Sequence, residues 1–209
     1  MFRRLLIAAA AIAALPLAAQ AQDTGSWLVR ARAVQLDSAN KDGTPLKLTI
    51  NDKTIPEVDI TYFFSPNIAA ELILTYPQKQ TVYSNGAEIG SFKHLPPTLT
   101  FQYHFTGMGA RPYIGAGINY TNISAVKFAP AVDAALHPGL KHNSVGLAVQ
   151  LGVDVPMGGG WVFNLDAKKV QIGTTVYSSG NSVGKFKVDP VLFAVGFGVS
   201  FSAIQKQRN

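Results

Sequence analysis

Strict alternation between apolar and polar residues is the feature of this sequence that most restricts its fold. From Leu99 to Phe105 every odd-numbered residue is apolar or aromatic and every even-numbered residue is polar. The same period of two runs from Val145 to Val155 and from Val191 to Phe201, opposite mainly small or polar residues. Successive side chains of a β-strand point to opposite faces, so this pattern predicts strands with one wholly apolar face.

Eight segments of this kind can be placed along the chain: the three just named and five others, at 27–33, 58–64, 68–76, 112–120 and 161–167. Short connections alternate with long loops, the short ones at 65–67, 106–110 and 156–160 and the long ones near 37–53, 77–96, 121–143 and 173–187. Short turns on one rim and long loops on the other are typical of outer-membrane barrels. We therefore predict an all-β fold: an eight-stranded antiparallel transmembrane β-barrel with short periplasmic turns and long extracellular loops. A short helix at 129–136 would cap its mouth.

A soluble β-sandwich or a lipocalin-like barrel would alternate in the same way. In those folds, however, the apolar face points inward and the outer face carries many Lys and Glu residues. Here the second face holds mainly Gly, Ala, Gln, Thr and isolated charges, and aromatic residues gather at the strand ends, as they do at membrane interfaces. With 47% hydrophobic and only 14% charged residues, the composition also favours the membrane.

The N-terminus is typical of an export signal. Arg3 and Arg4 precede an apolar stretch from Leu5 to Leu17, and Ala19-Gln20-Ala21 forms a small-residue cleavage site. We expect residues 1–21 to be a cleaved signal peptide, 22–201 the barrel and 202–209 a C-terminal tail. The chain has no cysteine, which excludes a lipid-anchored cysteine, a disulfide framework and a thiol nucleophile.

Several segments resemble the outer-membrane protein W (OmpW) family: 94–99, 111–121, 152–154 and the Asp189-Pro190 pair. The resemblance implies a monomeric eight-stranded barrel in the cell outer membrane, with a narrow, partly hydrophobic lumen, implicated in the passage of small hydrophobic compounds. Barrels of this family usually end at an aromatic residue that the assembly machinery reads, which makes Phe201 the expected assembly signal. Some relatives carry a bulky aromatic where Lys168 falls, opposite the aliphatic Ile73.

Charged residues on the inward face are the most informative side chains: Arg30, Arg32, Glu57, Asp59, Glu71, Asp154, Asp166 and Lys168. An unpaired charge in a narrow interior is costly, so we expect these residues to pair across strands. They would then form either a structural network that plugs the barrel or the lining of a solute path. The same candidate lumen lining includes the uncharged positions Ile73, Gln102, His104, Gln150 and Asn164.

The sequence gives little support for catalysis. Lipid-modifying barrels need a serine, a histidine and a carboxylate together at one rim. His104 is expected near a periplasmic turn, and His94 lies with Ser91 and Glu88 in a segment that is typical of solvated loops. His137 and His142 lack the spacing of metal ligands. We predict that the protein is not an enzyme and has no catalytic, metal or cofactor site.

Lysines dominate the expected loops: Lys41, Lys47, Lys53, Lys79, Lys93, Lys127, Lys141, Lys185 and Lys187. They are either solvated loop surface or a means of attracting the phosphates of lipopolysaccharide. Expected partners are therefore outer-membrane lipid and lipopolysaccharide, small hydrophobic molecules, the barrel-assembly machinery and periplasmic chaperones. No motif suggests nucleic acid.

Two functions remain open from the sequence. One is a narrow channel for small hydrophobic solutes that enter from outside and leave sideways into the bilayer, near Pro112 or in the stretch after Ala167 where the alternation weakens. The other is a non-transporting barrel for envelope integrity or surface interaction, because eight strands leave an interior mostly filled by side chains.

Overall fold

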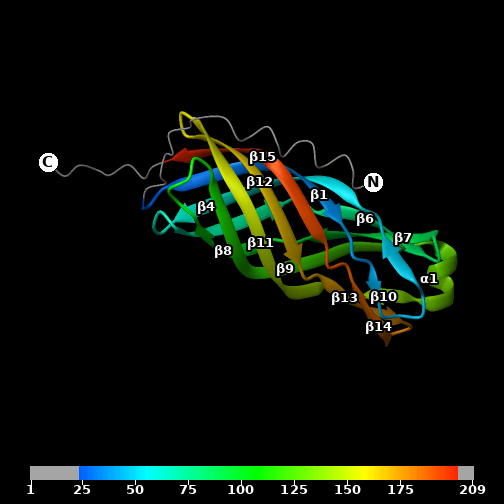
Figure 1. The fold of residues 1–209 in the computed structure, drawn as a ribbon. Coiled ribbons are helices and arrows are strands. Elements are labelled where there is room, and N and C mark those ends of the chain that lie inside the picture. Colours follow the sequence, from blue (N-terminus) through cyan, green and yellow to red (C-terminus); the bar gives the residue numbers. More distant parts are fainter. Residues whose placement is uncertain (1–23, 202–209) are drawn as a thin grey trace.

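A computed structural model describes residues 24–201 of the chain. Eight strands follow one another around a closed antiparallel barrel in the order β11-β12-β15-β1-β4-β5-β8-β9, and pairing of β9 with β11 completes the ring (Figure 1). Their bounds are β1 Trp27–Asp37, β4 Lys53–Phe63, β5 Ile68–Thr75, β8 Thr98–His104, β9 Arg111–Phe128, β11 Asn143–Gly158, β12 Trp161–Val170 and β15 Val191–Phe201. The predicted eight-stranded antiparallel barrel is confirmed. The expected signal peptide, 1–21, and tail, 202–209, lie outside the described residues.

The barrel wall is apolar on the outside and polar on the inside. Outward side chains such as Phe101 and Leu147 are 60% and 61% exposed, whereas their inward neighbours Gln102 and Ala148 are buried. A band of exposed large apolar residues surrounds a barrel in this way only where lipid covers it. The sequence alternation therefore has its structural counterpart in a lipid-facing wall.

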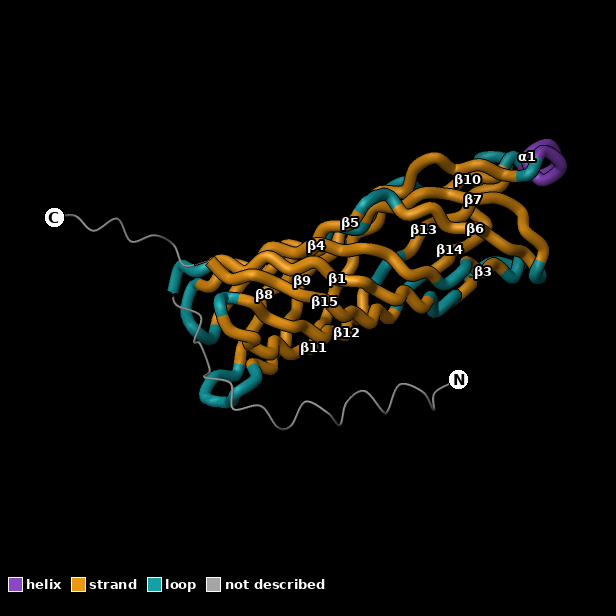
Figure 2. Tube along the Cα trace, turned by 90° about the horizontal axis from the view of Figure 1, so that it is seen from above, coloured by secondary structure: helices purple, strands orange, loops and turns teal. Residues whose placement is uncertain are grey.

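The two ends of the barrel differ. Short turns gather at one end, and the other end continues into a long extension that terminates in α1 (Pro130–Leu136) (Figure 2). The helix agrees with the one expected at 129–136, and it begins with a proline in its first turn, where no backbone N–H is needed. Within residues 24–201, no helix is long and apolar enough to cross a membrane.

The four long connections expected from the sequence contain strands of their own, most extensively in 77–96 and 173–187. The extension contains β2 (Lys41–Asp42), β3 (Leu48–Ile50), β6 (Gln78–Ser84), β7 (Ala87–Leu95), β10 (Pro138–Leu140), β13 (Gly173–Ser178) and β14 (Asn181–Lys187). Two tight hairpins explain the difference. Asn85-Gly86 joins β6 to β7 and Ser179-Gly180 joins β13 to β14, each with two consecutive positive φ angles. Such turns match the twist of paired strands and extend the sheet beyond the membrane.

The weak points expected near Pro112 and after Ala167 are regularly paired, which corrects the proposed exit routes. Pro112 stands opposite Val153 in the β9–β11 ladder, and the β11–β12 ladder runs without a break from Leu151–Ala167 to Ala148–Val170. The alternation looked weak there because Lys169 points outward and Val170 inward. Val170 packs in the apolar upper lumen and the Lys169 ammonium donates to the Asp189 carbonyl, so the strand accommodates both without a bulge.

Candidate functional site

The inward charges form one buried, ion-paired layer inside the membrane part of the barrel. Arg30 lies at its centre, with a fully buried guanidinium group. Its Nε donates to Asp59 at 2.7 Å, its Nη1 to both carboxylate oxygens of Asp154 at 3.0 Å, and its Nη2 to Glu71 at 2.7 Å. A fourth partner is the Thr61 hydroxyl, at 2.8 Å. Four strands, β1, β4, β5 and β11, thus meet at one side chain.

Arg32 and Lys168 extend this layer. Arg32 lies 2.9 Å from Glu57, 2.8 Å from Asp59 and 3.0 Å from Glu71. The ammonium group of Lys168 lies 2.9 Å from both Glu57 and Asp166. We call these three cations and the carboxylates of Glu57, Asp59, Glu71, Asp154 and Asp166 the ionic layer. The cross-strand pairs expected from the sequence are present.

Neutral side chains satisfy the remaining oxygens of the ionic layer. Gln150 donates to Glu71 at 2.7 Å and to Asp166 at 2.9 Å, and Gln102 donates to Glu71 at 2.8 Å. Asn164 donates to Asp154 at 2.8 Å. His104 is the lowest of the predicted lumen residues; one ring nitrogen lies 2.9 Å from Gln102, and the ring packs on Phe63.

Tyr113 belongs to this layer although the sequence analysis missed it. Its hydroxyl donates to Asp166 at 2.7 Å, and the Arg30 guanidinium lies 5.5 Å from the centre of its ring. The signal was available, because Tyr113 has the same parity as Gly115 and Gly117 on the inward face of β9.

Above the ionic layer, the inner wall becomes apolar. The buried residues of this upper lumen include Val34, Leu36, Ile55, Val82 and Phe92. A cavity of about 40 Å³ lies at the top, lined among others by Leu48, Phe92, Val132 and Leu136, which places α1 over its mouth. A second cavity of about 30 Å³ lies lower, against the ionic layer, where Ile73 and Lys168 both line it. We call this one the central cavity. Each of the two holds only one or two waters, so passage of a solute requires side chains to move.

The hydrogen-bonded wall has an opening beside the central cavity. Pairing of β5 with β8 ends at Ile73–Thr98, and pairing of β6 with β7 begins at Gln78–His94. Among the described residues, no ladder pair joins 74–77 to 95–97. Three of these seven positions are proline, Pro77, Pro96 and Pro97, and proline has no N–H to donate to a ladder. We call this opening the proline gap.

Both edges of the proline gap reach the central cavity. Thr75 lines the cavity from one edge, and His94 and Pro96 line it from the other. On the outer side, the exposed neighbours Leu74 and Tyr76 face the lipid. The apolar part of the lumen and the bilayer are therefore separated here by side chains alone.

His94 is placed differently from the expectation. It was expected in a solvated loop, but its side chain is only 2% exposed and lies inside the lumen, with Gln78 and Gln80 of the facing strand. Ser91 does not share its face, since Phe92 and His94 are the inward residues of β7. The Ser91, His94 and Glu88 combination considered for catalysis is therefore not assembled.

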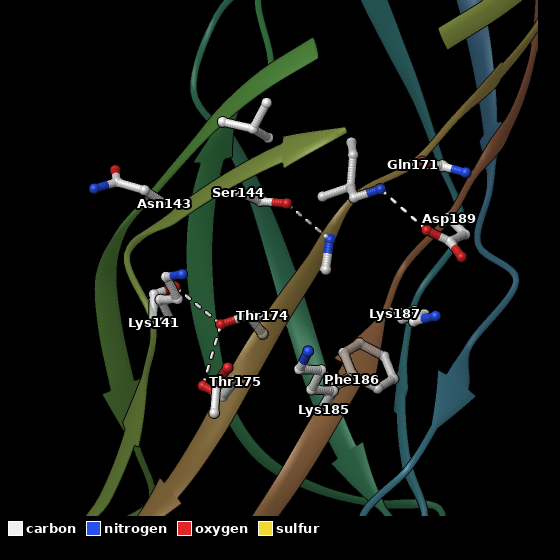
Figure 3. A pocket seen from close by; sticks show the side chains of 13 residues that line it. Lys141, Asn143, Ser144, Gln171, Thr174, Thr175, Lys185, Phe186, Lys187 and Asp189 are labelled. Atoms are coloured by element: carbon white, nitrogen blue, oxygen red, sulfur yellow. Dashed lines mark hydrogen bonds between the residues drawn. The ribbon is translucent and has the colours of Figure 1, made fainter. Parts of the chain in front are cut away.

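Three of the loop lysines surround a pocket on the outer surface. The pocket has a volume of about 330 Å³ and lies between the start of β11 and the β13–β14 hairpin, where Lys141, Lys185 and Lys187 line it (Figure 3). All three lysines are exposed, and within residues 24–201 none has a carboxylate oxygen within 4.0 Å. Val145 of β11 also lines this pocket; it is 75% exposed and begins the lipid-facing band. We call this the lysine pocket.

Comparison with known proteins identifies the barrel type. The model of the OmpW family matches residues 23–201. The chain belongs to the OmpW family. Outer membrane protein W of Vibrio cholerae is 31% identical over 208 residues, covering 92% of this chain and 95% of that protein. The outer-membrane protein y4mB of Sinorhizobium fredii is 41% identical over 186 residues, covering 84% and 79%.

A solved structure shows the same architecture. The chain is similar to the outer membrane protein OprG of Pseudomonas aeruginosa, with a TM-score of 0.74, 27% identity and coverage of 87% of this chain and 98% of that one. Membership of the OmpW family and these outer-membrane relatives place the protein in the cell outer membrane. The resemblance seen in the sequence is confirmed. In this OmpW-family barrel, the end with short turns faces the periplasm and the extension with α1 faces outward.

Proposed function

We propose that this barrel passes small hydrophobic solutes from outside the cell into the outer membrane, through the upper lumen and out sideways through the proline gap. The observation that carries the proposal is the position of the gap. It lies beside the central cavity and directly above the ionic layer. The sideways exit considered from the sequence is kept, but at Pro77, Pro96 and Pro97 instead of Pro112.

The energetics favour this route over passage through the whole barrel. To continue downward, an apolar solute would have to separate charges that hold one another at 2.7–3.0 Å in a buried layer. Breaking one buried ion pair costs about 3–5 kcal/mol. Moving from the upper lumen to lipid separates no ion pair and ends in apolar surroundings, so the sideways step carries no comparable penalty.

We further propose that the barrel is a monomer with no catalytic role and that its outer surface binds lipopolysaccharide. The lysine pocket supports this partner, because unpaired ammonium groups just above the lipid-facing band match the height of headgroup phosphates. Phe201 ends β15 opposite Trp27 and is 53% exposed, a placement compatible with recognition by the assembly machinery and periplasmic chaperones.

The transport proposal can be tested by filling the proline gap from inside. Thr75→Trp places a large ring at the edge of the central cavity. Leu74→Trp is the matched control, because Leu74 is the next residue but faces lipid. Uptake of a radiolabelled alkane would be measured in cells carrying the parent, either variant or no barrel. We expect Thr75→Trp to take up the alkane as slowly as cells without the barrel, and Leu74→Trp to behave as the parent.

The same experiment also tests the alternative function. Equal uptake by all four strains would refute transport and leave a barrel that serves envelope integrity or surface interaction. Surface amounts of each variant would be compared by the mobility shift of the heated and unheated barrel on gels. If Thr75→Trp failed to assemble, Thr75→Phe would replace it.

A further inference from the structure

Three buried polar side chains at the entrance to the proline gap have unused hydrogen-bonding atoms. Gln78 and Gln80 of β6 are fully buried, and His94 of β7 is 2% exposed. Within residues 24–201, no hydrogen-bond partner is present for Oε1 of Gln78, for either amide atom of Gln80 or for either ring nitrogen of His94. Leaving buried donors and acceptors unpaired is unfavourable, and such groups in a folded protein call for a specific explanation.

The three side chains lie together on the inner face of the β6–β7 hairpin. Gln78 stands opposite His94 in the ladder, and Gln80 stands opposite Phe92, whose ring centre is 6.0 Å from that of His94. The amide nitrogen of Gln78 is already used, because it donates to Thr75 at 2.8 Å and to the Tyr76 carbonyl at 2.7 Å. Gln78 therefore fixes one edge of the gap while its oxygen stays free.

The cavity beside this polar group has both apolar and polar walls. His94 lines it together with the apolar Leu36, Ile55, Ile73 and Leu192, and the ion pair of Lys168 with Glu57 also lines it. A molecule in this cavity would thus meet hydrocarbon from these side chains and unpaired hydrogen-bonding atoms at the His94 end. Such a site matches a solute with a long apolar body and one polar end.

The polar end that fits is neutral. His94 belongs to the extracellular part of the structure, where burial and the positive charge of Lys53 lower its pKa to about 4. At neutral pH its ring therefore has one donor and one acceptor. A carboxylate would find no unpaired cation here, because the Lys168 ammonium that also lines the cavity is already paired with Glu57 and Asp166, whereas a hydroxyl group can both donate to and accept from the neutral His94 ring.

We propose that Gln78, Gln80 and His94 bind the hydroxyl end of neutral, otherwise apolar solutes as they reach the proline gap. This inference rests on the proposed transport function and narrows its substrate class, from hydrocarbons in general to aliphatic alcohols and similar hydroxylated molecules. A hydrocarbon of equal length leaves the five atoms unpaired and passes less readily. A preference on the order of tenfold is expected from one net hydrogen bond.

The experiment compares 1-dodecanol with dodecane, both radiolabelled, in cells carrying the full-length barrel. The barrel-dependent part of each rate is obtained by subtracting uptake by cells without it. We expect the parent to favour dodecanol about tenfold. The Gln80→Leu/His94→Phe double variant should lose this preference, so that the ratio of its dodecanol rate to its dodecane rate falls to about one. Lys79→Leu is the control, since Lys79 lies between the two glutamines on the exposed face of β6.

The possible failures are distinguishable. If the parent takes up neither compound faster than cells without the barrel, the transport proposal itself is wrong. If the parent takes up both but the double variant keeps the parent's ratio, these side chains only hold water and the inference is overturned. Should the double variant not assemble, His94→Phe alone must lower the ratio, and an unchanged ratio in that variant would also overturn the inference.

Discussion

Replacement of Arg30 by methionine is the sharpest test of the ionic layer. The guanidinium group of Arg30 holds Asp59, Glu71 and Asp154. After its removal, Asp59 and Glu71 keep the guanidinium of Arg32 at 2.8 and 3.0 Å. Asp154 has no second cation within 4.0 Å among the described residues and keeps only the Asn164 amide at 2.8 Å. The uncompensated charge is therefore concentrated on Asp154.

The expected magnitude follows from this geometry. Leaving one buried charge without its partner costs about 3–5 kcal/mol, so Arg30→Met should lower the free energy of unfolding by that amount. Adding Asp154→Asn should restore about 1–2 kcal/mol, because an amide needs no counter-charge. Arg32→Met should lower the free energy of unfolding by less than Arg30→Met does, because the carboxylates that Arg32 contacts each keep another cation. Glu57 keeps Lys168, while Asp59 and Glu71 keep Arg30.

Urea unfolding of the refolded barrel in detergent micelles would measure these differences, followed by the fluorescence of its two tryptophans. Lys93→Met serves as the surface control, with an expected change within about 0.5 kcal/mol. A loss below about 1 kcal/mol for Arg30→Met, or no recovery on adding Asp154→Asn, would show that water reaches these groups. The layer would then not be the dry plug on which the sideways route depends.

Three further predictions follow from the barrel wall and its ends. Single cysteines at Phe101 and Val149 should be shielded by lipid from polar thiol reagents, and those at Gln102 and Gln150 should differ from them; equal labelling of neighbours would refute the register. Gly117→Ala should lower the free energy of unfolding, measured by urea titration, by about 1–3 kcal/mol, because its new Cβ would lie 1.9 Å from the Leu99 carbonyl oxygen. Gly139→Ala is the control and should be tolerated, because the nearest atom to its new Cβ would be 3.7 Å away. Phe201→Ala should reduce the amount of barrel in the outer membrane and deletion of 202–209 should not, as judged by membrane fractionation; the opposite result would misplace the assembly signal.

The membrane part of this fold could be predicted from sequence because lipid imposes the alternation directly. Every second residue of 99–105 and 145–155 must be apolar to face hydrocarbon, so the strands are visible without a partner. Above the membrane this constraint disappears. Lys79 and Lys93 lie on the outside and Gln78, Gln80 and His94 on the inside, so polar residues occupy both faces of β6 and β7 and the segment looks like a loop.

Of the candidate site, the ionic layer could be predicted from the sequence and the proline gap could not. Charges inside a lipid-facing barrel must pair with one another, and this identified the members of the ionic layer. The proline gap could not be found locally, because Pro77 lies between β5 and β6 and the Pro96-Pro97 pair between β7 and β8, and only the pairing of these strands brings the two interruptions together. Asn85-Gly86 was a usable hairpin signal that the length of the expected loop obscured.

The proline gap also divides the wall into two hydrogen-bonded units. Below it, eight strands close a complete ring, and above it the β6–β7 hairpin pairs with the upper half of β9. Strand β9 runs without interruption through both units, from Arg111 to Phe128. Regions joined by few hydrogen bonds open with their own free energies, so the extracellular unit can unfold and refold locally while the membrane ring stays intact. Opening of the outer hairpins therefore does not require the hydrogen bonds that anchor the barrel in the membrane to break.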